Sequence, residues 1–253
     1  MKYSLCIEPI FTDITVYDRI ALAKDCGVDA IELWNPVNYD AKKIGKALSS
    51  CNMTIAACCL SDAWKYRLNA PYEVVQRNVE RTISLGEDMG CTTFIGMTGD
   101  VECKVDRQRV ILIENLKRIS DFCLKKGVTI LLEPLNTIYD HKGFYLDSSY
   151  VGFEIVKCVN SPAIKLLYDC YHMQIMEGNL INNITANIDF IGHFHCAGVP
   201  GRHEPHHGEI NYPIVIGEIL NTGYSGYFGL EYWPTYDNLQ SVRDALNSFQ
   251  TKT

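Results

Sequence analysis

The chain has 253 residues, 47% of them hydrophobic, and its 23 Lys and Arg residues oppose 30 Asp and Glu residues for a formal net charge of −7. This length suits one α/β barrel, and a core of that size needs no disulfide cross-links. The acidic balance argues against a protein that tracks nucleic-acid phosphates, because such proteins present a dense Lys and Arg face. The sequence holds no run of 18 apolar residues, so we expect neither a membrane span nor a secretion signal.

Short apolar runs rich in β-branched residues alternate along the chain with longer stretches of helical periodicity. We predict strands at residues 3–7, 30–34, 54–60, 92–97, 128–132, 165–168, 190–196 and 226–232. The clearest helices are predicted at residues 15–26, 72–89, 106–126 and 212–220, and the glycines that follow them are Gly27, Gly90, Gly127 and Gly223. Glycine suits the end of a helix because it adopts the left-handed conformation.

This repeated order of helix, glycine and strand indicates parallel strands joined by right-handed crossovers. Eight strands are the number that closes a (β/α)8 TIM barrel. We therefore predict an α/β protein with a single TIM-barrel domain over residues 1–253. A doubly wound open sheet is the alternative, but no glycine-rich nucleotide-binding motif follows the first predicted strand.

The eleven cysteines are an odd number and include no C-x-x-C pair. Most lie in apolar runs, where a free cysteine behaves as a small hydrophobic residue. We interpret them as reduced, which favours a cytoplasmic location.

Polar residues end the last four predicted strands. They are Glu133, Asp169, His195 and Glu231. In a TIM barrel the carboxyl ends of the strands form the active face, so these four side chains are expected at one rim. Three converging carboxylates repel one another unless a cation neutralises them. A shell of carboxylate oxygens and one imidazole suits Mg²⁺, Mn²⁺ or Co²⁺, and the sequence therefore predicts a divalent metal site.

A second set of polar residues lies near these strand ends. His172 opens the helix that follows Asp169, and Arg202 lies in the polar loop after the seventh strand, where its guanidinium suits an anion. His193 lies two residues before His195, so both are expected on the barrel-interior face, with His193 one layer deeper. It would then bond to a carboxylate instead of binding the metal.

Five segments carry a resemblance to a known family. They are residues 132–137 (LEPLNT), 168–180 (YDCYHMQIMEGNL), 200–205 (PGRHEP), 208–213 (GEINYP) and 229–232 (GLEY). This part of the chain resembles the hydroxypyruvate isomerases of the xylose-isomerase-like barrel superfamily, whereas residues 1–127 resemble them in overall layout. The resemblance implies that Glu133 and Glu231 are the catalytic acid and base and that Glu133, Asp169, His195 and Glu231 surround the metal. It also implies that His172, Arg202 and His193 bind the substrate.

One position departs from the family pattern. The hydroxypyruvate isomerases often have Gln at the position of His195, whereas the ketose 3-epimerases of the superfamily have the His-x-His form that residues 193–195 show. The first hypothesis is therefore an intramolecular oxidoreductase that interconverts hydroxypyruvate and tartronate semialdehyde. A ketose 3-epimerase or a 2-oxo-tetronate isomerase on the same barrel is the alternative.

Two other classes of function are less favoured. An apurinic endonuclease would need further histidines at the ends of the second and third strands, and residues 31–34 and 58–61 contain none. A sugar-binding barrel without catalysis is the other candidate. We expect a small-molecule substrate and no nucleic-acid or membrane partner, and leave a homo-oligomer open.

Overall fold

The structure of the protein, a computed structural model, describes residues 1–100 and 105–250. In these residues eight strands pair in parallel and in chain order, and β8 pairs with β1 to close a barrel. The strands are β1 (Lys2–Cys6), β2 (Ala30–Leu33), β3 (Thr54–Cys59), β4 (Thr93–Gly96), β5 (Thr129–Leu132), β6 (Ile164–Asp169), β7 (Ile191–Cys196) and β8 (Tyr227–Leu230). The predicted α/β class and TIM barrel are confirmed, and each predicted strand overlaps one of these.

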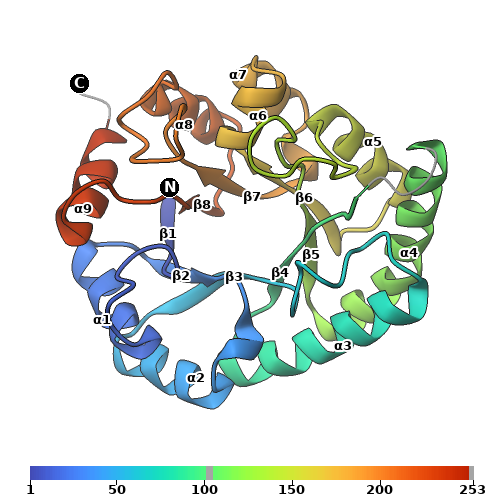
Figure 1. Ribbon diagram of the computed structural model, residues 1–253, viewed down its shortest axis with the longest axis horizontal. Coiled ribbons are helices and arrows are strands. Elements are labelled where there is room, and N and C mark those ends of the chain that lie inside the picture. The colour runs from blue at the N-terminus through green and yellow to red at the C-terminus, as the bar shows by residue number, and fades with distance from the viewer. Residues whose placement is uncertain (101–104, 251–253) are drawn as a thin grey trace.

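Helices surround the barrel as an outer ring (Figure 1). They are α1 (Val16–Cys26), α2 (Ala41–Ser50), α3 (Tyr72–Met89), α4 (Val105–Lys126), α5 (Ser149–Val159), α6 (Cys170–Met176), α7 (Leu180–Ala186), α8 (Tyr212–Asn221) and α9 (Asn238–Ser248), with short 3₁₀ turns η1 (Pro36–Asn38) and η2 (Ile188–Phe190). Helix α9 packs against α1, so the two ends of the chain meet in the ring. None of the helices in the described residues is long and apolar enough to cross a bilayer.

Local sequence signals explain where the predicted helices begin and end. Helix α1 follows Thr15, whose hydroxyl accepts a hydrogen bond from the Asp18 backbone N–H at 3.3 Å, and it ends at Gly27 with φ of 97°. A side-chain oxygen at the first position and a left-handed glycine at the last satisfy helix-end groups that have no partner inside the helix. Cys103 lies outside the described residues, and the other ten cysteines are free.

The outer face of the barrel is apolar, as the covering helices require. Phe194 on β7 and Phe228 on β8 are fully buried and stack at 5.9 Å, with Tyr212 of α8 and Phe249 against Phe228. The opposite faces of β7 and β8 carry His195 and Gly229, which are paired in register. This alternation places the histidine inside the barrel and the aromatic core outside it.

Candidate active site

Four consecutive strands bring three carboxylates and one imidazole together. Glu133 follows β5, Asp169 ends β6, His195 lies on β7, and Glu231 follows β8. One ligand atom from each residue lies within 4.8 Å of the others, and all four residues are buried. The structure thus brings together the four residues that the sequence singled out as strand ends.

Backbone geometry fixes two of these side chains. Asp169 is the N-cap of α6, and its Oδ1 accepts hydrogen bonds from the backbone N–H groups of Tyr171 at 2.8 Å and His172 at 3.4 Å. Asp169 is also paired in register with His195 on β7. Because Oδ1 is held by the helix, Oδ2 remains for other partners, and it lies 3.5 Å from His172 Nε2 and 3.7 Å from Arg202 Nη2.

The His195 ring presents one nitrogen to the carboxylates and one to the barrel interior. Its Nδ1 lies 3.4 Å from Glu231 Oε2 and 4.0 Å from Glu133 Oε1 and is buried without a hydrogen-bond partner, whereas its Nε2 bonds to Glu32. An unpartnered imidazole nitrogen among carboxylate oxygens fits a divalent cation of the Mg²⁺, Mn²⁺ or Co²⁺ type. The four donor groups are therefore suited to bind such a cation.

Glu231 is held from two directions. The indole Nε1 of Trp34, which follows β2, donates to its Oε1, and the Nη2 of Arg202 donates to its Oε2. The Trp34 ring lies 5.8 Å from the ring of Trp233. Both oxygens of the carboxylate are thus fixed.

The two glutamates have opposite electrostatic environments. Burial and the neighbouring Glu231 carboxylate raise the pKa of Glu133 to about 8. Burial alone would also raise the pKa of Glu231, but Arg202 and His195 outweigh burial and lower it to about 2. Burial raises the pKa of Asp169, with Arg202 opposing the shift. Two titratable groups whose environments separate their pKa values are typical of an acid and base pair.

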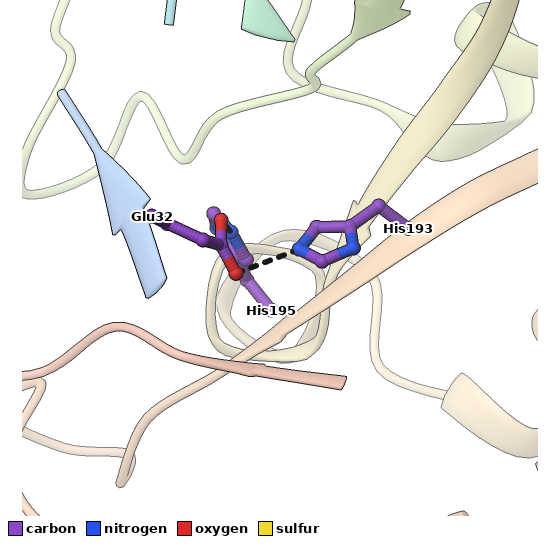
Figure 2. Close-up of side chains that lie close together, drawn as sticks. All are labelled: Glu32, His193 and His195. Atoms are coloured by element: carbon purple, nitrogen blue, oxygen red, sulfur yellow. Dashed lines mark hydrogen bonds and ion pairs between the residues drawn. The ribbon is translucent and has the colours of Figure 1, made fainter. Parts of the chain in front are cut away.

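Glu32 on β2 bridges the two histidines of β7. Its Oε1 lies 2.9 Å from His193 Nε2, and its Oε2 lies 2.8 Å from His195 Nε2 (Figure 2). Burial alone would raise the pKa of Glu32, but the two imidazoles hold it well below its usual range. His193 is therefore in the deeper layer and bonded to a carboxylate. This placement favours the bond to a carboxylate as its role, over contact with the substrate.

His172 lies behind the carboxylates with one ring nitrogen occupied. Its Nδ1 is 3.2 Å from the Asn136 backbone N–H and 2.7 Å from Asn136 Nδ2, while Nε2 lies 3.5 Å from Asp169 Oδ2. Burial and the nearby Arg202 cation lower the pKa of His172 well below its ordinary value. A neutral ring that accepts at Nδ1 carries its hydrogen on Nε2, which points that donor toward the site.

Arg202 closes the other side of the group. Its Nη2 pairs with Glu231 and lies 3.7 Å from Asp169 Oδ2, and its guanidinium lies 5.1 Å from the Tyr171 ring and 5.3 Å from the Trp233 ring. The residue has φ of 56°, an uncommon left-handed conformation for a side chain of this size. The loop thus holds the guanidinium between two rings and against two carboxylates.

A cavity of about 510 Å³ opens over these groups. Its lining residues are Trp34, Cys59, Trp64, Met97, Glu133, Leu135, Tyr139, Asp140, His141, Arg202, Glu231 and Trp233. A second cavity of about 690 Å³ shares Tyr139, Asp140, Arg202 and Trp233 with it. Aromatic rings with a few convergent polar groups are typical of small-molecule sites.

Several buried polar atoms of the site have no hydrogen-bond partner. Four of the eight such side-chain atoms in the described residues are His141 Nε2 and Arg202 Nε, on residues that line the cavity, and His172 Nε2 and His195 Nδ1, which lie next to Asp169 and Glu231. Buried polar groups are nearly always hydrogen-bonded, and an orphaned one calls for a specific explanation. A ligand that bonds to them is the explanation that their shared location favours.

Several residues of the site were not predicted. His141 and the tryptophans Trp34, Trp64 and Trp233 line the cavity from loops, where no period marks a side chain. Glu32 had a usable signal, since it is an acidic residue within the apolar strand that is predicted at residues 30–34. Its partners on β7 are 161 and 163 residues away, so sequence spacing does not connect them.

Known proteins resemble the chain along almost its whole length. The model of the xylose isomerase-like TIM barrel family matches residues 20–252. A 2-oxo-tetronate isomerase from Cupriavidus necator is 31% identical over 92% of this chain and 93% of its own length. The hydroxypyruvate isomerase of Escherichia coli is 28% identical over 92% of this chain and 94% of its own.

A solved structure gives the same fold. The crystal structure described as an AP endonuclease, family 2, from Brucella melitensis superimposes with a TM-score of 0.91 at 27% identity, covering 97% of this chain and 98% of its own. The likeness therefore covers nearly the whole barrel.

Proposed function

The chain belongs to the xylose isomerase-like TIM barrel family, and from this premise we propose that it is an isomerase of a small hydroxy-keto acid that interconverts hydroxypyruvate and tartronate semialdehyde. The observation that carries the proposal is the group of Glu133, Asp169, His195 and Glu231, whose ligand atoms lie within 4.8 Å of one another at the base of a cavity. The curated relatives named hydroxypyruvate isomerase and 2-oxo-tetronate isomerase support it.

Glu133 and Glu231 are the proposed acid and base. One carboxylate removes a proton from the hydroxyl-bearing carbon next to the carbonyl, and the other returns a proton to the former carbonyl carbon. A cis-enediolate lies between the two steps, and in it the hydroxyl hydrogen passes from one substrate oxygen to the other. Both side chains line the cavity, from the ends of β5 and β8. Positioned acid and base groups of this kind typically contribute about 10²- to 10⁴-fold in rate.

Glu133, Asp169, His195 and Glu231 would hold a divalent cation. Such a cation supplies electrostatic stabilisation of the negative charge that develops on the substrate oxygens. The mixed oxygen and nitrogen shell accepts Mg²⁺, Mn²⁺ or Co²⁺. Substrate oxygens or water would complete the coordination.

Arg202 and His172 are the proposed substrate-binding residues. The guanidinium of Arg202 matches a carboxylate in two parallel hydrogen bonds, and it already reaches the cavity. His172 would donate from Nε2, because its Nδ1 is held by Asn136. These contacts would orient the acid so that its reacting carbons face the two glutamates.

The cavity volume favours a second substrate class. About 510 Å³ is more than a three-carbon acid fills, so a 2-oxo-tetronate or a ketose 3-epimerisation on the same residues is the alternative. Endonuclease chemistry has less support, because β2 and β3 end in residues 32–34 and 58–60, which contain no histidine for a multi-metal centre.

A substrate panel in heavy water tests the proposal. Hydroxypyruvate, a 2-oxo-tetronate and a set of ketoses are incubated with the protein, with and without a chelator, and deuterium at each carbon is followed by NMR. We expect exchange and isomerisation of hydroxypyruvate that the chelator abolishes and Mn²⁺ or Co²⁺ restores. Turnover of ketoses with hydroxypyruvate refused would decide for epimerisation, and no exchange in any substrate would contradict both.

A further inference from the structure

We infer that Glu32 is a positioning residue that fixes His195 as the nitrogen ligand of the proposed metal site, with Nε2 turned to β2 and Nδ1 turned to the carboxylates. The inference rests on the proposed metal-dependent function and adds to it a residue from the opposite side of the barrel.

The first step is the hydrogen-bond pattern around Glu32. The carboxylate is 2% exposed and accepts from Ser4 Oγ at 2.5 Å, from His193 at 2.9 Å and from His195 at 2.8 Å. A carboxylate accepts hydrogen bonds and donates none, so each imidazole that it binds carries a hydrogen on Nε2. For His195 this leaves Nδ1 as the nitrogen that is available to a metal.

The second step is the direction in which the ring faces. His195 Nδ1 is buried, has no partner, and lies 3.4 Å and 4.0 Å from the nearest oxygens of Glu231 and Glu133. A ring turned by 180° would lose the bond to Glu32 and leave a buried carboxylate oxygen without its donor, which is costly. Metal-ligating histidines commonly bond to a carboxylate through the other nitrogen, and such partners set the ring orientation.

The third step is that neighbouring strands make room for this arrangement. The pairing of β2 with β3 shifts register between Ile31 and Glu32, an irregularity that re-aims a side chain. On β8, a Cβ at Gly229 would lie 2.8 Å from His195 Cδ2 and 3.1 Å from His193 Nε2, closer than packed atoms tolerate. Figure 2 shows the carboxylate of Glu32 facing the ring of His193.

A metal bound between Glu32, His193 and His195 themselves is the competing interpretation, since their ligand atoms also lie within 4.8 Å of one another. The donors to Glu32 argue against it. The Ser4 hydroxyl and the two Nε2 hydrogens already use the carboxylate oxygens and the ring nitrogens that such a metal would need.

Metal affinity measured without substrate tests the inference. Co²⁺ binding to the metal-free full-length protein is followed by isothermal titration for the wild type, Glu32→Gln and a matched control, Glu204→Gln. Glu204 is likewise fully buried and accepts three hydrogen bonds, from the backbone N–H and hydroxyl of Thr235 and from Ser241. Both variants lose a buried charge, but Glu204 contacts none of the four proposed ligands in the described residues.

We expect Glu32→Gln to weaken Co²⁺ binding by about 10- to 100-fold and Glu204→Gln to leave it within about threefold. Should Glu32→Gln fail to fold in a thermal melt without metal, Glu32→Asp keeps the charge at a longer distance and is expected to show an intermediate loss. Equal affinity in wild type and the Glu32 variants would overturn the inference while leaving the metal site intact. A second equivalent of Co²⁺ that disappears in Glu32→Gln would also overturn it. A wild type that binds no divalent metal would refute the metal part of the proposed function as well.

Discussion

The two halves of the barrel contribute different chemistry to one site. The ends of β5 to β8 supply the charged groups that face one another, namely Glu133, Asp169, His195 and Glu231. Strands β2 to β4 and the positions directly after them supply residues that hold these groups or enclose the cavity, and they are Glu32, Trp34, Cys59 and Met97. Reaction and positioning are therefore separable by mutation, because they are carried by residues far apart in the chain.

The largest expected effect lies in the second half. Glu133→Gln or Glu231→Gln removes a proposed acid or base while keeping the shape of the side chain, so we expect kcat to fall by about 10²- to 10⁴-fold. Deuterium incorporation from solvent is measured alongside turnover, and Glu80→Gln, at an exposed position on α3, serves as the control with unchanged rates. Full deuterium exchange into the substrate in both variants would contradict the assignment of these glutamates as acid and base.

Arg202→Lys tests whether the Arg202 guanidinium binds the substrate carboxylate or only packs against its neighbours. A lysine cannot reproduce the two parallel hydrogen bonds to a carboxylate, and we expect KM to rise by about 10- to 100-fold. Arg67 in the first half is the matched control, since its guanidinium stacks 4.4 Å from the Phe144 ring. Arg67→Lys should leave KM nearly unchanged. An equal rise of KM in the two variants would contradict a special role of Arg202 in binding the substrate.

Trp34→Phe tests whether the first half acts through a single hydrogen bond. The variant keeps an aromatic ring but loses the indole donor to Glu231. We expect kcat to fall by about tenfold, because about 1.5 kcal/mol, the lower end of the range for one bond to a charged group, corresponds to that factor. Trp64 stacks on His141 at 5.5 Å in the same cavity. If Trp64→Phe costs as much as Trp34→Phe, ring packing and not the donor is responsible.

Gly229→Ala perturbs the contact between the halves. Its new methyl group would meet Glu32 of β2 as well as the two histidines of β7, and we expect a loss of about 1–3 kcal/mol in the free energy of unfolding, measured in urea. At Gly217 in α8 a Cβ meets no atom within 4 Å, so Gly217→Ala should be neutral or stabilising. Equal stabilities for the two variants would show that the space beside His195 is not tight.

The smallest effect is a pH dependence of stability from His141. Burial lowers its pKa to about 4 from the ordinary 6.5, so between these values the unfolded chain binds more protons than the folded one. Stability is therefore full above pH 6.5 and declines as the pH falls toward 4, by at most about 2 kcal/mol with allowance for solvent screening. Urea midpoints at about pH 5 and 7.5 should differ less in His141→Gln than in the wild type. An unchanged difference would refute the assignment.

The four proposed metal ligands could be found from sequence because each interrupts an apolar run at its carboxyl end, and the barrel brings such ends together. Helix ends were predictable for a similar reason, since Gly27 and Gly90 adopt the left-handed conformation that ends a helix. These are local signals, in which a few adjacent residues determine the outcome.

Contacts across the barrel gave no such signal. The role of Glu32 was not predicted, because it depends on a register shift beside this residue and on its bonds to the histidines of β7. His193 shows the same limit, because the period of two places it inside the barrel but does not say which side chain it meets there.

The bond between Glu32 and His195 joins residues that are 163 positions apart. On the role proposed for Glu32, a fragment holding β5 to β8 would contain all four metal ligands and still bind the cation poorly. Ribosomal synthesis delivers β2 early and β7 late, and the histidine is oriented once both have joined one barrel. Metal binding would then require a closed barrel, so that a chain whose barrel has not closed would be inactive.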